Sequence, residues 1–251
     1  MTFEIVHIID KMEALYRIPR SKERFDIYLN MLQGGSGSDM ILPIAGYNPM
    51  GNDFVLEKLI DLKKLDVENL ISEELISLNR TLKSQDSTTF QVVINLIDDV
   101  GGAWSEHCTT DYNSRFKLTP LLRRKFSTPI FWTSENFNKN LIVERTRRQV
   151  YDTVYNCKFG PPLTLKDHVQ QELFVQNESI NINDVNELQD FEKLNRFYQK
   201  HSESKDYSLI FNFLYGDEAS ESLGYNNWGH KENACFSYAI MLSIMQNEKM
   251  S

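Results

Sequence analysis

The sequence contains few cysteines, and their arrangement excludes the common cysteine-based architectures. Cys108, Cys157 and Cys235 are odd in number, lie far apart and form no C-x-x-C pair. Neither a disulfide framework nor a zinc knuckle is therefore predicted. Because unpaired thiols of this kind are typical of a reducing compartment, we expect a cytoplasmic location.

Long apolar runs are also lacking, which argues against a chain that spans a membrane. No run approaches the roughly 20 consecutive apolar residues that a transmembrane helix needs. The first 20 residues are interrupted by charged side chains and contain no small-residue cleavage site, so no secretory signal is expected. The sequence therefore predicts a soluble protein without a membrane partner.

The motifs of several well-defined enzyme classes are absent. Neither G-x-S-x-G nor H-E-x-x-H occurs, and the glycine-serine stretch at residues 34–38 lacks the lysine of a P-loop. A hydrolase serine, a zincin-type metal site and a P-loop are therefore not indicated. The substrate and the reaction have to be sought in looser groupings of residues.

The composition is that of an ordinary globular protein. Of the 251 residues, 41% are hydrophobic and 25% are charged, far from the pattern of intrinsic disorder. A chain of this length buries roughly 70–75% of the surface that its unfolded form exposes. We therefore expect a well-packed core.

Hydrophobic spacing predicts a helical N-terminal region over residues 1–85. Apolar residues recur every three or four positions from Ile5 to Tyr16, and a second helix follows Ser21, a typical N-cap residue. Residues 34–52 carry five of the eleven glycines and two prolines, which predicts a long loop. Loops of this length often bind ligands, although a plain connector is an equal alternative.

Residues 86–251 are predicted to mix strands with helices. The β-branched segment 90–97 is typical of a buried strand. Gly101 and Gly102 are placed to turn the chain back into a strand at 103–110. Two further strands are predicted at 129–133 and 207–215. Helices are expected from about 133 to 155, from Thr164 to 174, from Asp184 to 198 and at the C-terminus. The predicted class is α+β, predominantly helical, with a small mixed or antiparallel sheet of about three to five strands flanked by helices. The two regions could also form one continuous domain.

The charge is distributed unevenly along the chain. The net charge is −8, but residues 113–158 hold ten Lys and Arg against three acidic residues, a balance of +7 that leaves −15 for the rest. Aromatic residues lie among these cations, a combination that suits nucleic acids. A solvated helix face is the simpler interpretation, and an acidic protein generally repels polyanions. A nucleic-acid or protein interaction module that uses segment 113–158 is kept as an alternative function, with nucleic acid the less favoured partner.

The densest group of reactive side chains follows the segment 90–97. We expect an enzyme or ligand-binding protein whose pocket lies near residues 99–115 and accepts a small anionic molecule. In this scheme His107 is the catalytic acid or base and Asp99 is the second catalytic residue. The ligand-binding residues would be Gly101 and Gly102, which permit close backbone approach, Trp104 as a wall, and Arg115 as the anion contact.

A metal-dependent hydrolase is the second alternative. His107 and Asp111 are four residues apart, as are His168 and Glu172, and such pairs share one face of a helix. Together with Asp99 they provide His and carboxylate ligands of the kind that divalent metals accept. The spacing has no specificity of its own, so a divalent metal ion is only a candidate cofactor.

Overall fold

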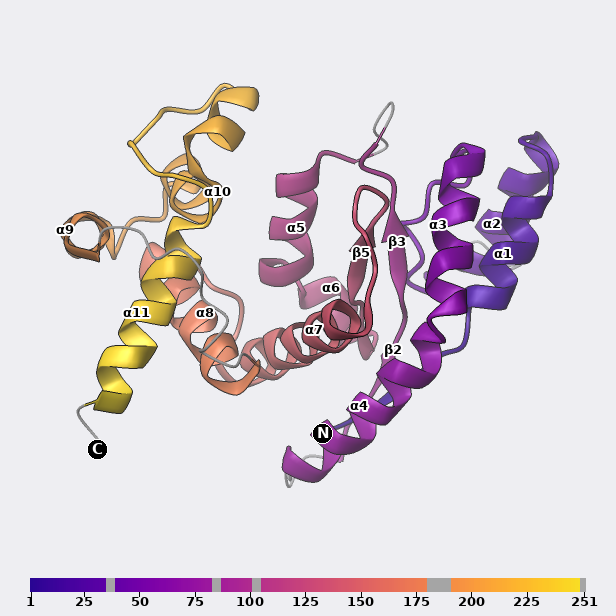
Figure 1. The fold of residues 1–251 in the computed structure, drawn as a ribbon, viewed down its shortest axis with the longest axis horizontal. Helices are drawn as coiled ribbons and strands as arrows, with labels where there is room; N and C mark the ends of the chain where they lie inside the picture. Colours follow the sequence, from indigo (N-terminus) through magenta and orange to yellow (C-terminus); the bar gives the residue numbers. More distant parts are fainter. Residues whose placement is uncertain (35–38, 83–86, 101–104, 180–190, 249–251) are drawn as a thin grey trace. The chain divides into compact units, whose positions relative to one another are not determined.

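The computed structural model describes residues 1–34, 39–82, 87–100, 105–179 and 191–248. It is 62% helical, which confirms the prediction of a predominantly helical protein with a small sheet (Figure 1). The chain divides into two compact units, Met1–Thr153 and Val154–Ser251. Within the first unit, strands that precede and follow residues 83–86 pair with each other.

The described residues of the first unit form five strands and helices α1 to α6, together with most of α7. The strands are β1 (Thr2–Ile5), β2 (Thr89–Val92), β3 (Asn95–Ile97), β4 (Phe126–Ser127) and β5 (Ile130–Trp132). The helices are α1 (Ile9–Arg17), α2 (Lys22–Gln33), α3 (Asp53–Lys64), α4 (Val67–Thr81), α5 (His107–Phe116), α6 (Thr119–Arg123) and α7 (Lys139–Phe159). In Figure 1, β3 and β5 lie between α3 on one side and α5 on the other.

Every strand pair among the described residues is parallel, so the prediction of a mixed or antiparallel sheet is wrong. β2 pairs with β1 and β4, and β3 pairs with β5. The backbone bonds from Val93 N to Ser127 O and from Asn95 N to Pro129 O, both 3.0 Å, continue the pairing from the β2–β4 ladder to the β3–β5 ladder. The helices α1 to α4, and then α5 and α6, return the chain to the same edge of the sheet, which is how parallel strands are connected.

Strand β1 was predicted as part of the first helix. Its pairing with β2 fixes it as a strand, and the side chain of Asn79 on α4 bonds both the N–H and the carbonyl oxygen of Phe3 at 2.9 Å. Asn79 is 76 residues from Phe3 in the sequence, and the paired residue Phe90 is 87 residues away. Long-range pairing therefore overrides the local helical spacing here.

The loop between α2 and α3 is anchored to the core. Buried Asn95 on β3 donates to Pro43 O at 2.8 Å, and its side-chain oxygen accepts from Gly46 N at 3.1 Å. The hydroxyl groups of Tyr28 and Tyr16 donate to the carbonyl oxygens of Ile44 and Asn48. The described part of this segment contains no strand, in agreement with the predicted loop.

Helix α5 lies where a returning strand was expected. The carboxylate of Glu106 accepts hydrogen bonds from Cys108 N and Thr109 N, which caps the helix and starts it at His107. A short-range cap therefore decides between helix and strand for this polar segment. The later helix α7 also begins at Lys139, with Asn138 bonding Leu141 N at 2.9 Å, and not after Thr133 as predicted.

The described residues of the second unit form helices joined by loops and contain no strand. It contains the end of α7 and α8 (Leu165–Ser179), α9 (Phe191–His201), α10 (Tyr207–Ser222) and α11 (Ala234–Glu248). The reciprocal bonds between Thr164 and Asp167 form a capping box at the start of α8, where the sequence predicts a helix from Thr164. The expected start of a helix at Asp184 lies outside the described residues.

Segment 207–215 is the first part of a helix, so its prediction as a strand is wrong. Asp206 caps α10 by accepting from Ser208 N at 2.9 Å, and residues 209–216 are all buried. An apolar run buried on every side lacks the periodicity that separates helix from strand. Among the helices that the structure describes, none combines the length and apolar character needed to cross a bilayer.

Candidate functional site

The candidate site lies where β3 and β5 end side by side. Thr133 N donates to Ile97 O at 3.0 Å, so the residues that follow the two strands meet at one edge of the sheet. Asp98 and Asp99 follow β3, while Thr133 and Ser134 follow β5. In open parallel sheets, ligands bind at the carboxyl ends of the strands.

Asp99 is the centre of the hydrogen bonds at this edge. Its Oδ1 accepts from Ser134 N at 2.9 Å and Thr133 Oγ1 at 3.1 Å. Its Oδ2 accepts from Ser134 Oγ at 2.6 Å and lies 3.0 Å from His107 Nδ1. The Asp99 side chain is only 6% exposed, so this carboxylate is held in one orientation.

The imidazole of His107 is fixed between Asp99 and an aromatic ring. It stacks on the buried indole of Trp132, with 3.9 Å between ring centroids and 21° between planes. Its backbone position at the first residue of α5 is set by the Glu106 cap. The His107 side chain is still 48% exposed, so its outer edge faces solvent.

The electrostatics of the pair favour an ionised Asp99. Burial raises the pKa of Asp99, but the hydrogen bonds from Ser134, His107 and Thr133 together outweigh it and hold the pKa below the ordinary 3.8. An ionised carboxylate only accepts hydrogen bonds, so Nδ1 of His107 must carry the hydrogen. In the neutral imidazole, Nε2 then keeps its lone pair and makes no hydrogen bond to any residue that the structure describes.

Such a pair has the chemical capacity for proton transfer. A carboxylate that orients an imidazole and stabilises its protonated form is the arrangement by which histidine acts as a general acid or base. Ser134 does not complete a serine triad, because its hydroxyl donates to Asp99 and not to His107. The structure thus brings together Asp99 and His107, the two residues that the sequence suggested for catalysis.

The other predicted site residues are placed differently. Arg115 lies on α5 two turns beyond His107, which is about 12 Å along the helix axis. Its NH1 atom is 3.4 Å from Asp111 Oδ2, so the two residues form an ion pair within the helix. Gly101, Gly102 and Trp104 lie outside the described residues.

The candidate metal ligands do not form a recognisable site. Within the described residues there is no group of three or more His, Cys, Asp or Glu side chains that could hold a metal ion. His168 and Glu172 lie on α8 in the second unit, where both are 1% exposed, and Nδ1 of His168 contacts Thr164 O at 2.7 Å. A role for these side chains in packing accounts for their burial.

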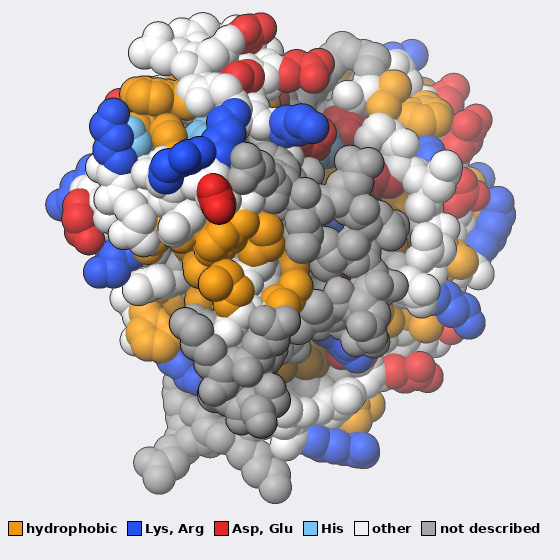
Figure 2. Space-filling view, turned by 60° about the vertical axis from the view of Figure 1, so that its left-hand side comes forward, with side chains coloured by type: hydrophobic (Ala, Val, Ile, Leu, Met, Phe, Trp, Pro, Cys, Tyr) orange, Lys and Arg blue, Asp and Glu red, His pale blue; other side chains and the backbone are white. Residues whose placement is uncertain are grey.

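Several cations of segment 113–158 are paired with acidic residues. Arg124 pairs with Asp39, Arg145 with Glu135, and Arg147 with Glu74, in addition to the pair on α5. Figure 2 shows one face of the molecule, on which Lys and Arg side chains lie at several separate places among acidic and uncharged ones. These ion pairs reduce the positive charge that the segment can offer to a polyanion.

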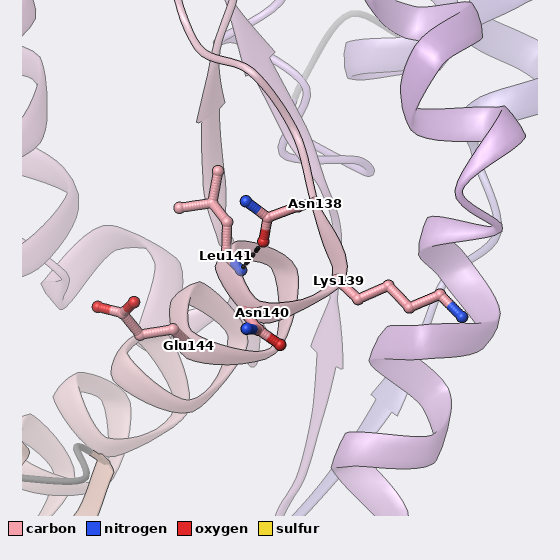
Figure 3. Close-up of a pocket in the computed structure, with 5 residues that line it drawn as sticks. All are labelled: Asn138, Lys139, Asn140, Leu141 and Glu144. Carbon is pink, nitrogen blue, oxygen red and sulfur yellow. Dashed lines mark hydrogen bonds between the residues drawn. The ribbon is translucent and has the colours of Figure 1, made fainter. Parts of the chain in front are cut away.

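A shallow depression of about 430 Å³ lies at the start of α7 (Figure 3). Its lining residues are Asn138, Lys139, Asn140, Leu141 and Glu144. In Figure 3 the side chains of Lys139 and Glu144 extend to opposite sides of the helix, and only Asn138 bonds another lining residue. Because the polar groups do not converge, this depression is a poor candidate for a binding site.

Sequence reasoning missed the partners that β5 supplies. The sequence predicts a strand at 129–133 and a helix from about 133, and neither prediction assigns Thr133 or Ser134 to a site. The signal in the sequence was an apolar strand followed directly by hydroxyl residues. It points to partners of Asp99 only once β3 and β5 are known to be parallel neighbours.

Comparisons of the chain with protein-family models, with curated proteins and with solved structures find no match.

Proposed function

We propose that the protein is an enzyme in which His107, oriented by Asp99, transfers a proton to or from a small anionic molecule. The observation that supports this most is the contact of 3.0 Å between Asp99 Oδ2 and Nδ1 of His107, whose side chain is 48% exposed. The location at the carboxyl ends of parallel strands supports it further. Arg115 is the candidate contact for the anionic group. The ligand would have to compete with Asp111, which forms an ion pair with Arg115.

The tautomer of His107 provides a test that needs no known substrate. Long-range ¹H–¹⁵N spectra above neutral pH should show the Nδ1–H tautomer for His107, because Asp99 accepts that hydrogen. In an Asp99→Ala variant this preference should disappear. A wild-type protein with the hydrogen on Nε2 would contradict the proposal, since Nε2 would then have no lone pair with which to act as a base.

A turnover assay tests the activity itself. The purified protein would be incubated with panels of carboxylated and phosphorylated metabolites, and conversion followed by mass spectrometry. His107→Ala should lower any conversion by about 10²–10⁴-fold, the usual contribution of a general acid or base. His7→Ala is the matched control, because His7 also contacts a carboxylate, Glu68 at 3.2 Å, and its side chain is 62% exposed.

The two variants separate a chemical role from a structural one. Conversion that is lost in His107→Ala and retained in His7→Ala supports the proposal, whereas equal conversion by both variants contradicts it. Arg115→Ala tests the anion contact independently. If this variant converts or binds anionic molecules as well as the wild type does, Arg115 is not that contact.

A further inference from the structure

A second pocket, of about 300 Å³, lies in the first unit among three helix ends. It is formed by the C-terminal end of α1 and the N-terminal ends of α2 and α3. The residues that matter for its chemistry are Tyr16, Arg17, Arg20, Arg24 and Asp53. Its size is at the lower end of the range for small-molecule pockets.

Arg24 is a buried cation with few partners. It is 2% exposed, yet none of the ion pairs among the described residues includes it. Its NH1 and NH2 atoms donate to the carbonyl oxygens of Ile18 and Gly51 at 3.3 and 3.4 Å, both long for hydrogen bonds. Its Nε–H has no acceptor among the residues that the structure describes.

Such a guanidinium is costly to fold into a protein. A buried charge is normally paired or fully hydrogen-bonded, because desolvation of an uncompensated ion opposes folding. The centroid of the Tyr16 ring lies 4.4 Å from the guanidinium carbon of Arg24. This cation–π contact compensates the charge less fully than a paired carboxylate would. Burial accordingly lowers the pKa of Arg24, and the charge of Arg20 lowers it further. Tyr16 and Asp53 raise this pKa, but by less.

The surroundings of Arg24 are suited to an anion. Arg20 is exposed at the same pocket, where its NH1 donates to Asn52 Oδ1 at 2.8 Å, and Arg17 is held by Glu13. Helices α2 and α3 each have 12 residues, and their N-terminal ends carry positive partial charge. Asp53 is the one carboxylate among the lining residues and opposes this field.

We propose that this pocket binds the phosphate group of a small phosphorylated molecule, with Arg24 as the buried donor and Arg20 as the outer one. The planar fork of a guanidinium matches phosphate oxygens in a bidentate manner, and helix N-termini favour phosphate. A doubly charged phosphate compensates several positive groups better than a single carboxylate does. The proposal does not depend on the activity of Asp99 and His107.

The test uses the full chain with inorganic phosphate as the probe. Binding would be measured by calorimetry and by thermal shift, with sodium chloride at matched ionic strength and acetate as reference salts. Phosphate should raise the melting temperature of the wild type more than either reference. Arg20→Ala should weaken the affinity on the order of tenfold, as expected for the loss of a charge-assisted hydrogen bond.

Further variants distinguish a binding role of Arg24 from a structural one. Arg24→Met should abolish the response to phosphate while leaving the stability of the phosphate-free protein equal or higher, because it removes an uncompensated buried charge. Asp53→Asn should tighten phosphate binding several-fold by removing the opposing carboxylate. Lys22→Ala is the control, since Lys22 lies on the same helix but pairs with Asp26 outside the pocket.

Several results would overturn the proposal. A wild type that responds to phosphate no more than to chloride lacks the site, and an equal response to acetate would show that phosphate is not preferred. Phosphate binding that survives in Arg24→Met, or that falls equally in Lys22→Ala and Arg20→Ala, would place the phosphate elsewhere. If Arg24→Met does not fold, the opposite effects expected for Arg20→Ala and Asp53→Asn still decide the matter.

Discussion

Replacing Asp99 with Asn removes one charge and preserves the size of the side chain. Oδ1 of the amide can still accept from Ser134 N and Thr133 Oγ1, as the carboxylate does. The other position becomes an NH2 group that faces Ser134 Oγ and His107 Nδ1. All bonds to this side chain lose the negative charge. The two at the NH2 position weaken most, because Ser134 Oγ and His107 Nδ1 must change from donors to acceptors.

The expected loss follows from the strengths of these bonds. A hydrogen bond to a charged group contributes about 1.5–3 kcal/mol and a neutral one about 0.5–1.5 kcal/mol, so each bond weakens by roughly 1 kcal/mol. The free energy of unfolding of the first unit should fall by about 2 kcal/mol at pH 7. Because the pKa of Asp99 is lowered in the folded protein, this advantage of the wild type exists above the ordinary pKa of 3.8 and is lost as the pH falls through the lower, folded value.

Denaturant unfolding followed by tryptophan fluorescence measures this difference. A Trp228→Phe background would confine the signal to the first unit, which contains Trp132 and Trp104. The difference between wild type and Asp99→Asn should shrink as the pH is lowered from about 4. A difference below about 0.5 kcal/mol at pH 7, or one that stays constant down to pH 3, would refute the assigned role of the carboxylate.

Two further predictions concern the second unit. Gly216→Ala should lower the free energy of unfolding by about 2–4 kcal/mol, because φ is +83° and the added Cβ would lie 2.6 Å from Glu232 N. Gly224→Ala, also at positive φ but with open space around it, should lower it by only about 1 kcal/mol, and equal losses in urea unfolding would contradict the assigned clash. Burial lowers the pKa of His230 to about 4, and neither ring nitrogen has a hydrogen-bond partner among the described residues. The unfolded chain therefore binds a proton first as the pH falls, so stability should decrease by about 3 kcal/mol between pH 6.5 and 4. A His230→Phe variant that keeps this pH dependence would show that another group causes it.

Local patterns in the sequence were sufficient for many of the helices. The Ser21 cap and the glycine that follows Gln33 define α2, and the paired residues Thr164 and Asp167 define the start of α8. Each of these signals depends on residues within about one helical turn of one another, so it can be read without knowledge of the fold. The dominance of helix and the small size of the sheet follow from the same local evidence.

The direction of the sheet, and with it the geometry of both proposed sites, was decided only by tertiary structure. Strand β1 exists because β2 and Asn79 pair with it, and Asp99 meets Ser134 because β3 and β5 end at the same edge. The sequence alone drew attention to Asp99 and His107 by their chemistry, but it gave no indication of Arg24. Arg24 is buried and forms no ion pair among the described residues. This can be recognised only in the folded structure, because the residues around Arg24 come from separate parts of the sequence.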